Sequence, residues 1–359
     1  MSDDPTLSLD EVHHLAERVL RAHGFSDAQG GAIAATVTAA ERDGCTSHGL
    51  FRIPFYVAAL KNESVDAGAE PTVAADDSAV VHVDGARGFC PLALDRGLPL
   101  LAEAARRHGI ASLAIHEVYN IAALWPEVER LAGEGLVAFA FTASNACVAP
   151  AGGITPVYGT NPMAFGWPRA SRPPMVFDQA SSACARGEIQ LHLREGKPLP
   201  EGWAIDARGE PTTDPTDALA GAQLPFGGHK GAAIALMVEL LAGALIGELF
   251  SLESKARDVH RTGAPFGGEF LIAIDPARHV RGGAGSTGAG SGDPKSGSGS
   301  VPSPASHLER AETLFAAVLE QEGTRLPSDR RFAARKRTAA EGVRVAASLH
   351  ATLDELARA

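Results

Sequence analysis

Residues 42–56, with the sequence RDGCTSHGLFRIPFY, bring four chemically active side chains close together: Ser47, His48, Arg52 and Tyr56. The imidazole of His48 can change its charge near neutral pH, and the guanidinium of Arg52 is a permanent cation suited to a carboxylate. Because proline is tolerated in the first turn of a helix, a helix that begins near Arg52 would place Arg52 and Tyr56 on one face. The spacing alone favours a simpler interpretation, in which a turn joins two helices and the arginine is only solvated.

The composition excludes some classes of protein. A chain of 359 residues with 45% hydrophobic and 21% charged side chains can form two or three globular units with ordinary cores. The net charge of -11 argues against a nucleic-acid partner. The basic run RLPSDRRFAARKR at 325–337 is either a solvated face or a patch that binds phosphate.

The sequence carries no targeting or metal-binding signal. Its N-terminal segment is acidic and amphipathic, unlike a secretory signal. The longest apolar run, 232–247, is interrupted by Glu239 and is too short to span a bilayer. The four cysteines form no CxxC pair and no zinc spacing, which fits a reduced cytosol. We therefore expect a cytoplasmic protein that binds neither a metal nor a membrane.

Helices and strands alternate along the chain, which predicts a mixed α/β fold. Ser8 and Ser26 each precede a Glu or Gln by three residues, the spacing of a capping box. We expect helices after both serines, the second at about 27–42 and leading into the His48 segment. The stretches AVVHVDG, GIASLAIHEV, GLVAFAFTAS and MVFDQASS are typical of strands, with a helix at about 94–108. The stretch EGWAIDARGEPTTDPTDAL has the composition of a surface loop.

From 281 to 306 the sequence consists mainly of glycine and serine and cannot form a core, so we expect a flexible insertion. It contains the pattern GxGxxG at Gly283, Gly285 and Gly288. A dinucleotide fingerprint requires a helix directly after this pattern and an acidic residue about 20 positions further on. Here more glycine and serine follow, so we expect neither a cofactor contact from these glycines nor an ordinary Rossmann site.

Two other segments have features of phosphate-binding loops. VYGTNPMAFGWP at 157–168 is rich in turns and leaves backbone amides free near Gly159 and Thr160. In LPFGGHKGAAIALMVELLAGAL, His229 and Lys230 come just before a long apolar helix, where free amides and a lysine suit a phosphate. A tightly packed glycine turn explains the second segment equally well.

Taken together, these segments resemble the type-2 malate/L-lactate dehydrogenase family of NAD(P)H-dependent oxidoreductases. The resemblance extends from about Leu7 to Ile274 and returns at TRLPSDRR near the C-terminus. The segments AALWPEVE at 122–129 and PTTDP followed by LPFGGHKG are most similar to the Δ1-piperideine-2-carboxylate/Δ1-pyrroline-2-carboxylate reductases. Only the glycine- and serine-rich insertion lies outside the resemblance.

The resemblance implies a mixed sheet flanked by helices, a nicotinamide site that is not of Rossmann type, and a homodimer. It divides the chain into an N-terminal helical, substrate and dimerisation part at 1–115, joined by 307–359, an NAD(P)H-binding part at 116–280, and the insertion at 281–306. The expected partner is a small-molecule substrate.

The resemblance also assigns the cofactor, which we expect to be NADPH, with NADH possible. A 2′-phosphate gains from nearby guanidinium groups, and the chain offers Lys230, Arg325, Arg330 and Arg331. The residues that the resemblance assigns to the cofactor are Asn120, Ile121, Ala122, Ala123, Leu124, Thr160, Asp178, Gln179, Ala180, His229 and Lys230.

By resemblance, His48 is the proton donor of the reaction, with Ser47 beside it and Glu188 completing a relay. Relatives have an aspartate at the relay position, so the carboxylate of Glu188 is one methylene further out. A cyclic imine beside a carboxylate accepts a hydride readily only when its nitrogen is protonated, so the site needs a proton donor and an anion clamp. Arg52 is the candidate for the clamp because a bidentate pair fixes both position and charge, and Tyr56 is also assigned to the substrate.

The substrate remains open at this stage. Reduction of the two cyclic imines would produce L-pipecolate or L-proline. The same residues would protonate the carbonyl oxygen of a 2-oxo acid, so a malate/lactate-type 2-hydroxy acid dehydrogenase is an alternative. Tyr119 and Asn120 stand where relatives have histidines near the nicotinamide. His48 must therefore act alone in a reductase, and a repurposed family member without hydride transfer is a further alternative.

Overall fold

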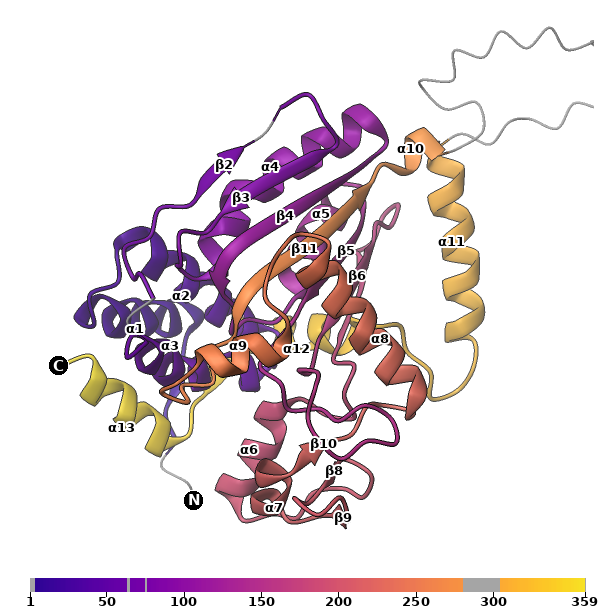
Figure 1. Ribbon diagram of the computed structural model, residues 1–359. Helices are drawn as coiled ribbons and strands as arrows, with labels where there is room; N and C mark the ends of the chain where they lie inside the picture. Colours follow the sequence, from indigo (N-terminus) through magenta and orange to yellow (C-terminus); the bar gives the residue numbers. More distant parts are fainter. Residues whose placement is uncertain (1–3, 63–64, 75, 280–303, 359) are drawn as a thin grey trace, which may run out of the picture.

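The computed structural model describes residues 4–62, 65–74, 76–279 and 304–358. Its centre is a mixed sheet in the order β2-β3-β4-β11-β5-β6-β7 (Figure 1). These strands are β2 (Thr72–Ala74), β3 (Val80–Asp84), β4 (Ile110–Tyr119), β5 (Val137–Thr142), β6 (Met163–Trp167), β7 (Met175–Gln179) and β11 (Phe266–Ile274). Among the described strands of this sheet, only β3 and β4 pair in parallel. The predicted mixed α/β fold is confirmed, and a sheet so largely antiparallel is not the doubly wound parallel sheet of a Rossmann fold.

Helices cover both faces of the sheet. On one face lie α4 (Cys90–His108) and α5 (Trp125–Gly133), and on the other lies α8 (His229–Glu239) with the π-helical turn Leu240–Ala244. Side chains alternate along a strand, so β11 contributes to both cores. Leu271 and Ala273 pack under α4 and α5, whereas Phe270 and Ile272 pack under α8.

The N-terminal helices α1 (Leu9–Ala22), α2 (Asp27–Arg42) and α3 (Ile53–Ala59) form a further core beside the sheet. The helix starts predicted at Ser8 and Ser26 are confirmed, because each serine accepts a hydrogen bond from the backbone three residues later. The reciprocal bond of a capping box is present at Ser8, and the α2 start has the serine bond alone.

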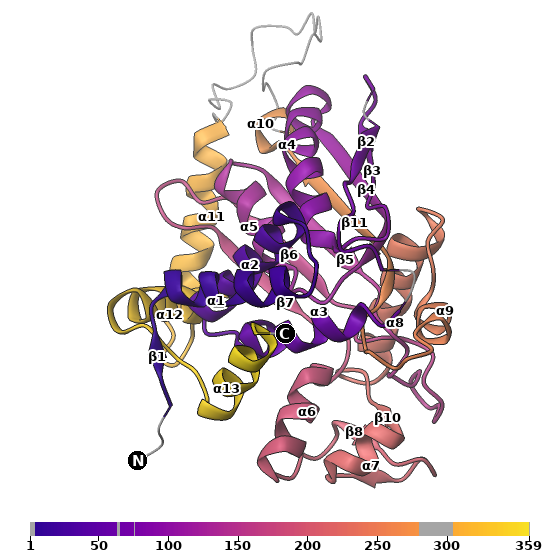
Figure 2. The ribbon, with the colours of Figure 1, turned by 90° about the vertical axis from the view of Figure 1, so that its left-hand side faces the viewer.

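The C-terminal segment packs on these N-terminal helices (Figure 2). Strand β12 (Val343–Arg344) pairs with β1 (Thr6–Leu7), and α13 (Ala347–Leu356) contacts α1. Upstream, α12 (Asp329–Glu341) contacts the end of α2, where the Thr338 hydroxyl donates to the Arg42 carbonyl over 2.8 Å.

A small unit lies below the main sheet in Figure 1. It consists of α6 (Arg186–Glu195), α7 (Pro215–Ala220) and a sheet in the order β10-β8-β9, with β8 (Ala204–Ile205), β9 (Pro211–Thr212) and β10 (Ala222–Gln223). The stretch predicted to be a surface loop therefore contains the β8–β9 hairpin and much of α7. The hairpin forms because the Gly209 amide donates to the Asp206 carbonyl over 3.0 Å, closing a tight turn.

The remaining helices are α9 (Ser251–Arg257), α10 (Pro276–His279) and α11 (Pro304–Leu319). The insertion expected at 281–306, with its GxGxxG pattern, lies outside the described residues except for 304–306, which begin α11. The boundary expected at 115/116 falls inside β4, so it divides a strand of the central sheet. No described helix is both long and apolar enough to cross a membrane.

Candidate active site

Two short 3-10 turns between α2 and α3 carry the side chains from which the sequence analysis began. The first is Thr46–His48 and the second is Leu50–Arg52. Glu41, on the last turn of α2, accepts a hydrogen bond from the Leu50 amide over 2.7 Å. A Cβ at Gly49, the residue between the turns, would lie 2.1 Å from the Glu41 carboxylate. Only glycine therefore allows α2 to pack this closely against the turn.

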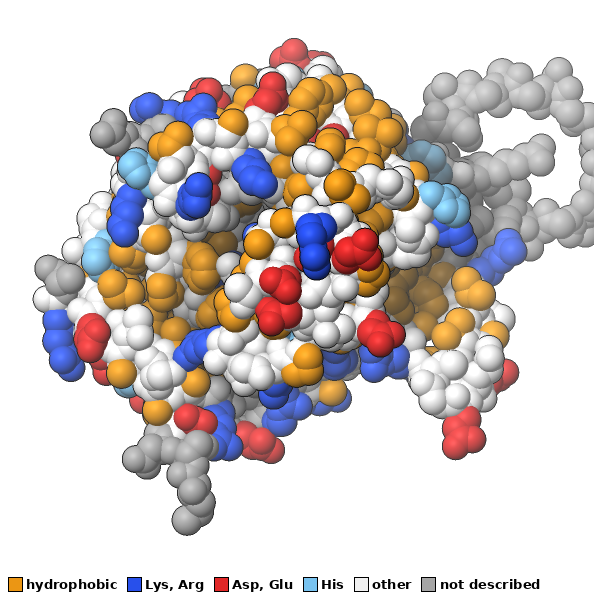
Figure 3. Space-filling model, turned by 60° about the horizontal axis from the view of Figure 1, so that its bottom comes forward, with side chains coloured by type: hydrophobic (Ala, Val, Ile, Leu, Met, Phe, Trp, Pro, Cys, Tyr) orange, Lys and Arg blue, Asp and Glu red, His pale blue; other side chains and the backbone are white. Residues whose placement is uncertain are grey.

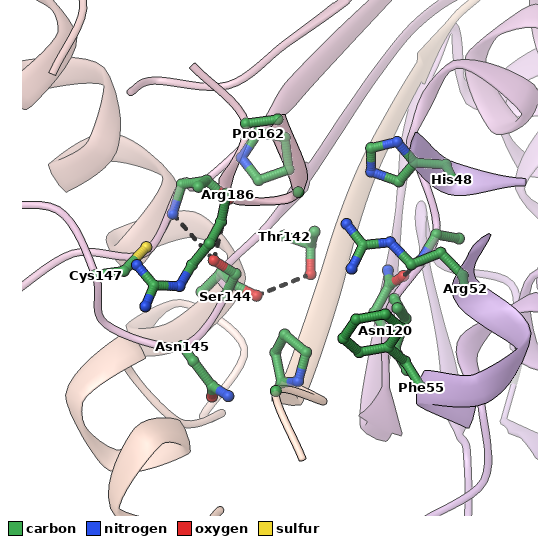
Figure 4. Close-up of a pocket in the computed structure, with 18 of the residues that line it drawn as sticks. His48, Arg52, Phe55, Asn120, Thr142, Ser144, Asn145, Cys147, Pro162 and Arg186 are labelled. Atoms are coloured by element: carbon green, nitrogen blue, oxygen red, sulfur yellow. Dashed lines mark hydrogen bonds between the residues drawn. The ribbon is translucent and has the colours of Figure 1, made fainter. Parts of the chain in front are cut away.

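Ser47, His48 and Arg52 are in direct contact, as expected. The Ser47 hydroxyl lies 3.1 Å from His48 Nδ1, and Arg52 Nε donates to the Ser47 carbonyl over 2.8 Å. His48 and Arg52 line a cavity of about 170 Å³. Figure 4 shows them on one side of it, across from Ser144 and Arg186.

The charges of this cavity follow from its burial. Burial, and then the neighbouring Arg52 cation, lower the pKa of His48 to about 3. Burial also lowers the pKa of Arg52, to about 10, so Arg52 still carries its charge at neutral pH. The site thus combines a neutral imidazole with a fixed cation, which suits the binding of an anion.

Tyr56 does not reach this cavity, contrary to the assignment of Tyr56 to the substrate. Its side chain is only 1% exposed and packs edge-on against Phe89, with 4.9 Å between ring centroids. Burial raises the pKa of its hydroxyl far above the usual value. It lies one helical turn beyond Arg52, where that face of α3 enters the N-terminal core.

Ser47 and His48 also line a larger cavity of about 780 Å³. Six of the residues assigned to the cofactor line it: Ala122, Ala123, Thr160, Asp178, Gln179 and Ala180. Asn120 and Ile121 line the smaller cavity, and Ala122 and Thr160 line both. The volume falls within the range of about 300–1,000 Å³ that ligand sites usually have.

The loop between β4 and α5 is held over this cavity by Asp178. The carboxylate of Asp178 accepts hydrogen bonds from the amides of Leu124 and Trp125 over 2.9 and 3.2 Å. The Leu124 side chain is fully buried behind the loop, so Leu124 can contribute to the cavity only through its backbone. Burial raises the pKa of Asp178 to about 6, and the Leu124 amide opposes this shift.

Glu188 lines the larger cavity together with Ser47 and His48. It lies in the first turn of α6, and in the described part of the chain no hydrogen bond joins it to either of them. The structure thus brings the three proposed relay residues to one cavity, where Ser47 contacts His48 but Glu188 is hydrogen-bonded to neither within the described residues.

His229 and Lys230 lie apart from both cavities. They are the first residues of α8, and both are exposed. Gly227 and Gly228 before them have φ values of +55° and +62°, a conformation that favours glycine. The glycine pair is therefore explained by the turn into α8.

The C-terminal basic segment contributes to the larger cavity. Arg330, Arg331 and Arg337 line it, and Arg325 joins Arg330 and Arg331 around an adjoining hollow of about 160 Å³. The Nε atom of Arg331 is buried without a hydrogen-bond partner, although its Nη2 donates to the Val176 carbonyl over 2.8 Å.

An ion-pair network at Asp43 holds the basic segment in place. Asp43 is 2% exposed and accepts two hydrogen bonds of 2.6 Å from Arg335 on α12. It also accepts from the Trp125 indole over 3.0 Å, and Arg335 pairs with Glu129 on α5 as well. Burial would raise the pKa of Asp43, but the hydrogen bonds from Arg335 and Arg42 lower it on balance.

Sequence reasoning missed much of the wall opposite His48. Ser144, Asn145 and Cys147 follow β5, and Arg186 begins α6. The polar run TASN at the end of a predicted strand was the available signal for the first two, because the loops that follow strands often carry binding residues. Nothing in the sequence indicated that these residues would lie opposite His48 across one cavity.

A family model for malate/L-lactate dehydrogenase matches residues 7–286. The chain belongs to this family. It is therefore an oxidoreductase that uses a nicotinamide cofactor, and the resemblance inferred from the sequence motifs is confirmed. A Δ1-pyrroline-2-carboxylate/Δ1-piperideine-2-carboxylate reductase of Pseudomonas aeruginosa is 52% identical over 347 residues, which cover 97% of this chain and 98% of that protein. A Δ1-pyrroline-2-carboxylate reductase of Ancylobacter novellus is 48% identical over 99% of this chain and 98% of its own length.

Solved structures of the family have the same fold. The crystal structure of Δ1-piperideine-2-carboxylate reductase from Pseudomonas syringae pv. tomato superimposes with a TM-score of 0.86, covers 98% of this chain and 99% of its own, and is 40% identical. Malate dehydrogenase from Entamoeba histolytica, at 20% identity, shares the fold with a TM-score of 0.85 over 99% of this chain and 98% of its own.

The depressed pKa of His48 predicts a loss of stability in acid. In the unfolded chain a histidine has a pKa of about 6.5, whereas folding lowers the pKa of His48 to about 3. As the pH falls below about 6.5, the unfolded chain takes up a proton that the folded chain does not. Stability is therefore lost progressively between these two values, and His48→Gln should remove this contribution.

Urea unfolding at pH 7 and pH 5 measures the effect. The free energy of unfolding of the parent should fall by roughly 2 kcal/mol more than that of His48→Gln. The exposed His260 offers a control, since His260→Gln should behave like the parent. Equal losses in the parent and His48→Gln would contradict the prediction.

Proposed function

We propose that the chain is an NADPH-dependent reductase of Δ1-pyrroline-2-carboxylate and Δ1-piperideine-2-carboxylate, which it converts to L-proline and L-pipecolate. The observation that carries the proposal is the half-buried Arg52 beside His48, a fixed cation next to a group that can transfer a proton. The names of the two bacterial relatives, each about half identical over nearly the whole chain, support this substrate class.

The larger cavity fits the cofactor by size and by its orphaned donor. The buried Nε of Arg331 lacks a partner, and a phosphate oxygen would satisfy it. The residues that would hold the cofactor are the loop 120–124, Thr160 and the segment 178–180. When bound, the reduced nicotinamide supplies the hydride.

Arg52 would bind the substrate carboxylate and thereby change the acidity of His48. The charge of Arg52 is one of the two causes that lower the pKa of His48. A carboxylate paired with Arg52 offsets that charge, so substrate binding should raise the pKa of His48 and allow it to carry the proton for the imine nitrogen. Ser47, 3.1 Å from Nδ1, orients the ring, and Glu188 supplies the negative end of the proposed relay.

Steady-state kinetics with NADPH and both cyclic imines test this assignment. His48→Ala should lower kcat by about 10²–10⁴, as expected when a general acid is removed. Arg52→Gln should instead raise KM for the imines roughly tenfold or more. Neither variant should change the Kd of NADPH measured by nicotinamide fluorescence.

A panel of 2-oxo acids completes the experiment. Reduction of a 2-oxo acid without reduction of either imine would replace the proposed substrate with that of a 2-hydroxy acid dehydrogenase. Cofactor binding with no reduction of any compound would favour a repurposed family member.

We infer a preference for NADPH from the arginines of the C-terminal segment. Arg325, Arg330 and Arg331 surround one hollow, where a 2′-phosphate could pair with guanidinium groups. Lys230 does not line this hollow or either cavity, so within a single chain it does not support the preference for NADPH.

Arg330→Gln tests the preference, because Arg330 is exposed and its loss should not affect folding. The variant should bind NADPH roughly fivefold more weakly, about 1 kcal/mol, with no change for NADH. Arg310→Gln, on the exposed surface of α11, is the matched control. Equal dissociation constants of the parent for NADPH and NADH would exclude the preference.

A homodimer is the assembly that we propose. Along α8 and the turn after it, Leu236, Leu240 and Leu245 are 47, 50 and 61% exposed. Apolar side chains grouped in this way often mark an interaction site, and Figure 3 shows broad apolar areas among the charged groups on the face that it displays.

Sedimentation equilibrium measures the assembly. The parent should sediment as a dimer, and Leu240→Asp should weaken or abolish it by placing a charge in the interface. Leu193→Asp is the control, because Leu193 is 45% exposed on α6, away from this stripe. A parent that sediments as a monomer would contradict the proposal.

A further inference from the structure

The side-chain amide of Asn120 is fixed at both ends. Its Nδ2 donates to Glu269 Oε2 over 2.7 Å, and its Oδ1 accepts from the Ala122 amide over 3.0 Å. The backbone amide of Asn120 donates to the Pro265 carbonyl over 3.2 Å. Because a carboxylate can only accept and an N–H can only donate, these partners determine which way the amide faces.

The loop 120–124 therefore has two carboxylate anchors. At its far end, Asp178 accepts from Leu124 and Trp125, as described above. At its near end, Glu269 holds Asn120, which itself lines the smaller cavity with His48 and Arg52. Between the anchors lie Ile121, Ala122 and Ala123, which line the two cavities.

Burying Glu269 in the middle of β11 costs free energy of folding. It is fully buried, and it also accepts a hydrogen bond from the Cys90 thiol over 3.1 Å. Glu127, only 4% exposed, lies close enough to interact with it electrostatically. In the described ranges neither glutamate has an ion-pair partner, and Glu269 Oε1 and Glu127 Oε2 have no hydrogen-bond partner.

A buried carboxyl without a cation destabilises a fold, so its presence suggests a role other than stability. Burial raises the pKa of Glu269 to about 7, and burial followed by the charge of Glu269 raises the pKa of Glu127 well above its usual value. A proton on Glu269 Oε1 or Glu127 Oε2, the two oxygens without a partner, leaves Glu269 Oε2 free to accept the hydrogen bond from Asn120. The bond to Asn120 therefore persists while the pair avoids two adjacent charges.

We propose that Glu269 is a positioning residue for the reaction: it orients the Asn120 amide, and through it the loop that binds the nicotinamide cofactor. The proposal rests on the proposed function only in assigning the loop to the cofactor. Glu269 itself lines neither cavity, so its effect must pass through Asn120.

A double-mutant cycle on cofactor binding tests the proposal in the full-length protein. Glu269→Met keeps a side chain of similar length but removes the acceptor, and Asn120→Ala removes the donor. Each should raise the Kd of NADPH, measured by nicotinamide fluorescence, by about tenfold. The double variant should be no worse than either single variant, because both interrupt one interaction. Glu127→Gln is the matched control, since Glu127 is also buried but makes no hydrogen bond to the loop within the described residues, and it should stay within twofold of the parent.

A reversed pair gives a second test that does not depend on the folding of Glu269→Met. Asn120→Asp places two carboxyls together and should raise the Kd. Adding Glu269→Gln to it restores a donor and an acceptor in the opposite direction, and should return the Kd to within threefold of the parent. A purely structural role for Glu269 gives no reason for such rescue.

The outcomes separate this proposal from the proposed substrate. Additive effects in the cycle, a Glu269→Met variant that binds NADPH within twofold of the parent, or a failure of the reversed pair to restore binding would each overturn the positioning role. If the parent binds NADPH but reduces neither imine, the substrate assignment fails while the cycle still decides the role of Glu269. A parent that binds neither NADPH nor NADH would overturn both proposals.

Discussion

The Asp43–Arg335 ion pair joins three of the segments that line the larger cavity. Asp43 ends α2 just before the His48 turn, Trp125 begins α5 just after the loop 120–124, and Arg335 lies on α12 behind Arg330 and Arg331. Removing one partner of a buried pair leaves an uncompensated charge, at a cost of about 3–5 kcal/mol. The position of the His48 turn therefore depends on a contact between residues almost 300 positions apart.

Three carboxylates organise the site by bonding to other parts of the protein. Glu41 supports the turn that carries Arg52, Asp178 supports the loop 120–124, and Asp43 supports the basic segment. Each accepts hydrogen bonds from backbone or side-chain donors of the protein itself. The smaller cavity itself is lined by Arg52 and Arg186 and, among its described lining residues, by no carboxylate. An anionic substrate meets only positive and neutral groups there.

The features that could be predicted from the sequence depend on residues that are close together in the chain. The grouping of Ser47, His48 and Arg52, the helix starts at Ser8 and Ser26, and the family motifs all lie within short stretches, where spacing alone places side chains together. The burial of Tyr56, which was assigned to the substrate, could not be foreseen because the face of α3 that becomes core depends on Phe89, which comes from another element.

The features that could not be predicted depend on contacts between distant parts of the chain. Glu269 is an isolated acidic residue in an apolar stretch, and its proposed role depends on its hydrogen bond with Asn120, which is 149 positions away. Arg186 stands two residues before Glu188, the proposed relay carboxylate, and only the fold brings it opposite His48. The family motifs marked Asp178, but not that its carboxylate would hold the loop 120–124.

The position of β11 has a consequence for how the chain folds. Strands β4 and β5 are consecutive in the sequence, yet β11 lies between them and hydrogen-bonds to both. During synthesis the β2-β3-β4 and β5-β6-β7 halves must wait for residues 266–274 before their inner edges are paired. Non-local pairing of this kind slows folding, and open strand edges invite association with other chains. The nascent protein is thus most vulnerable to aggregation over the interval between the synthesis of β7 and the insertion of β11.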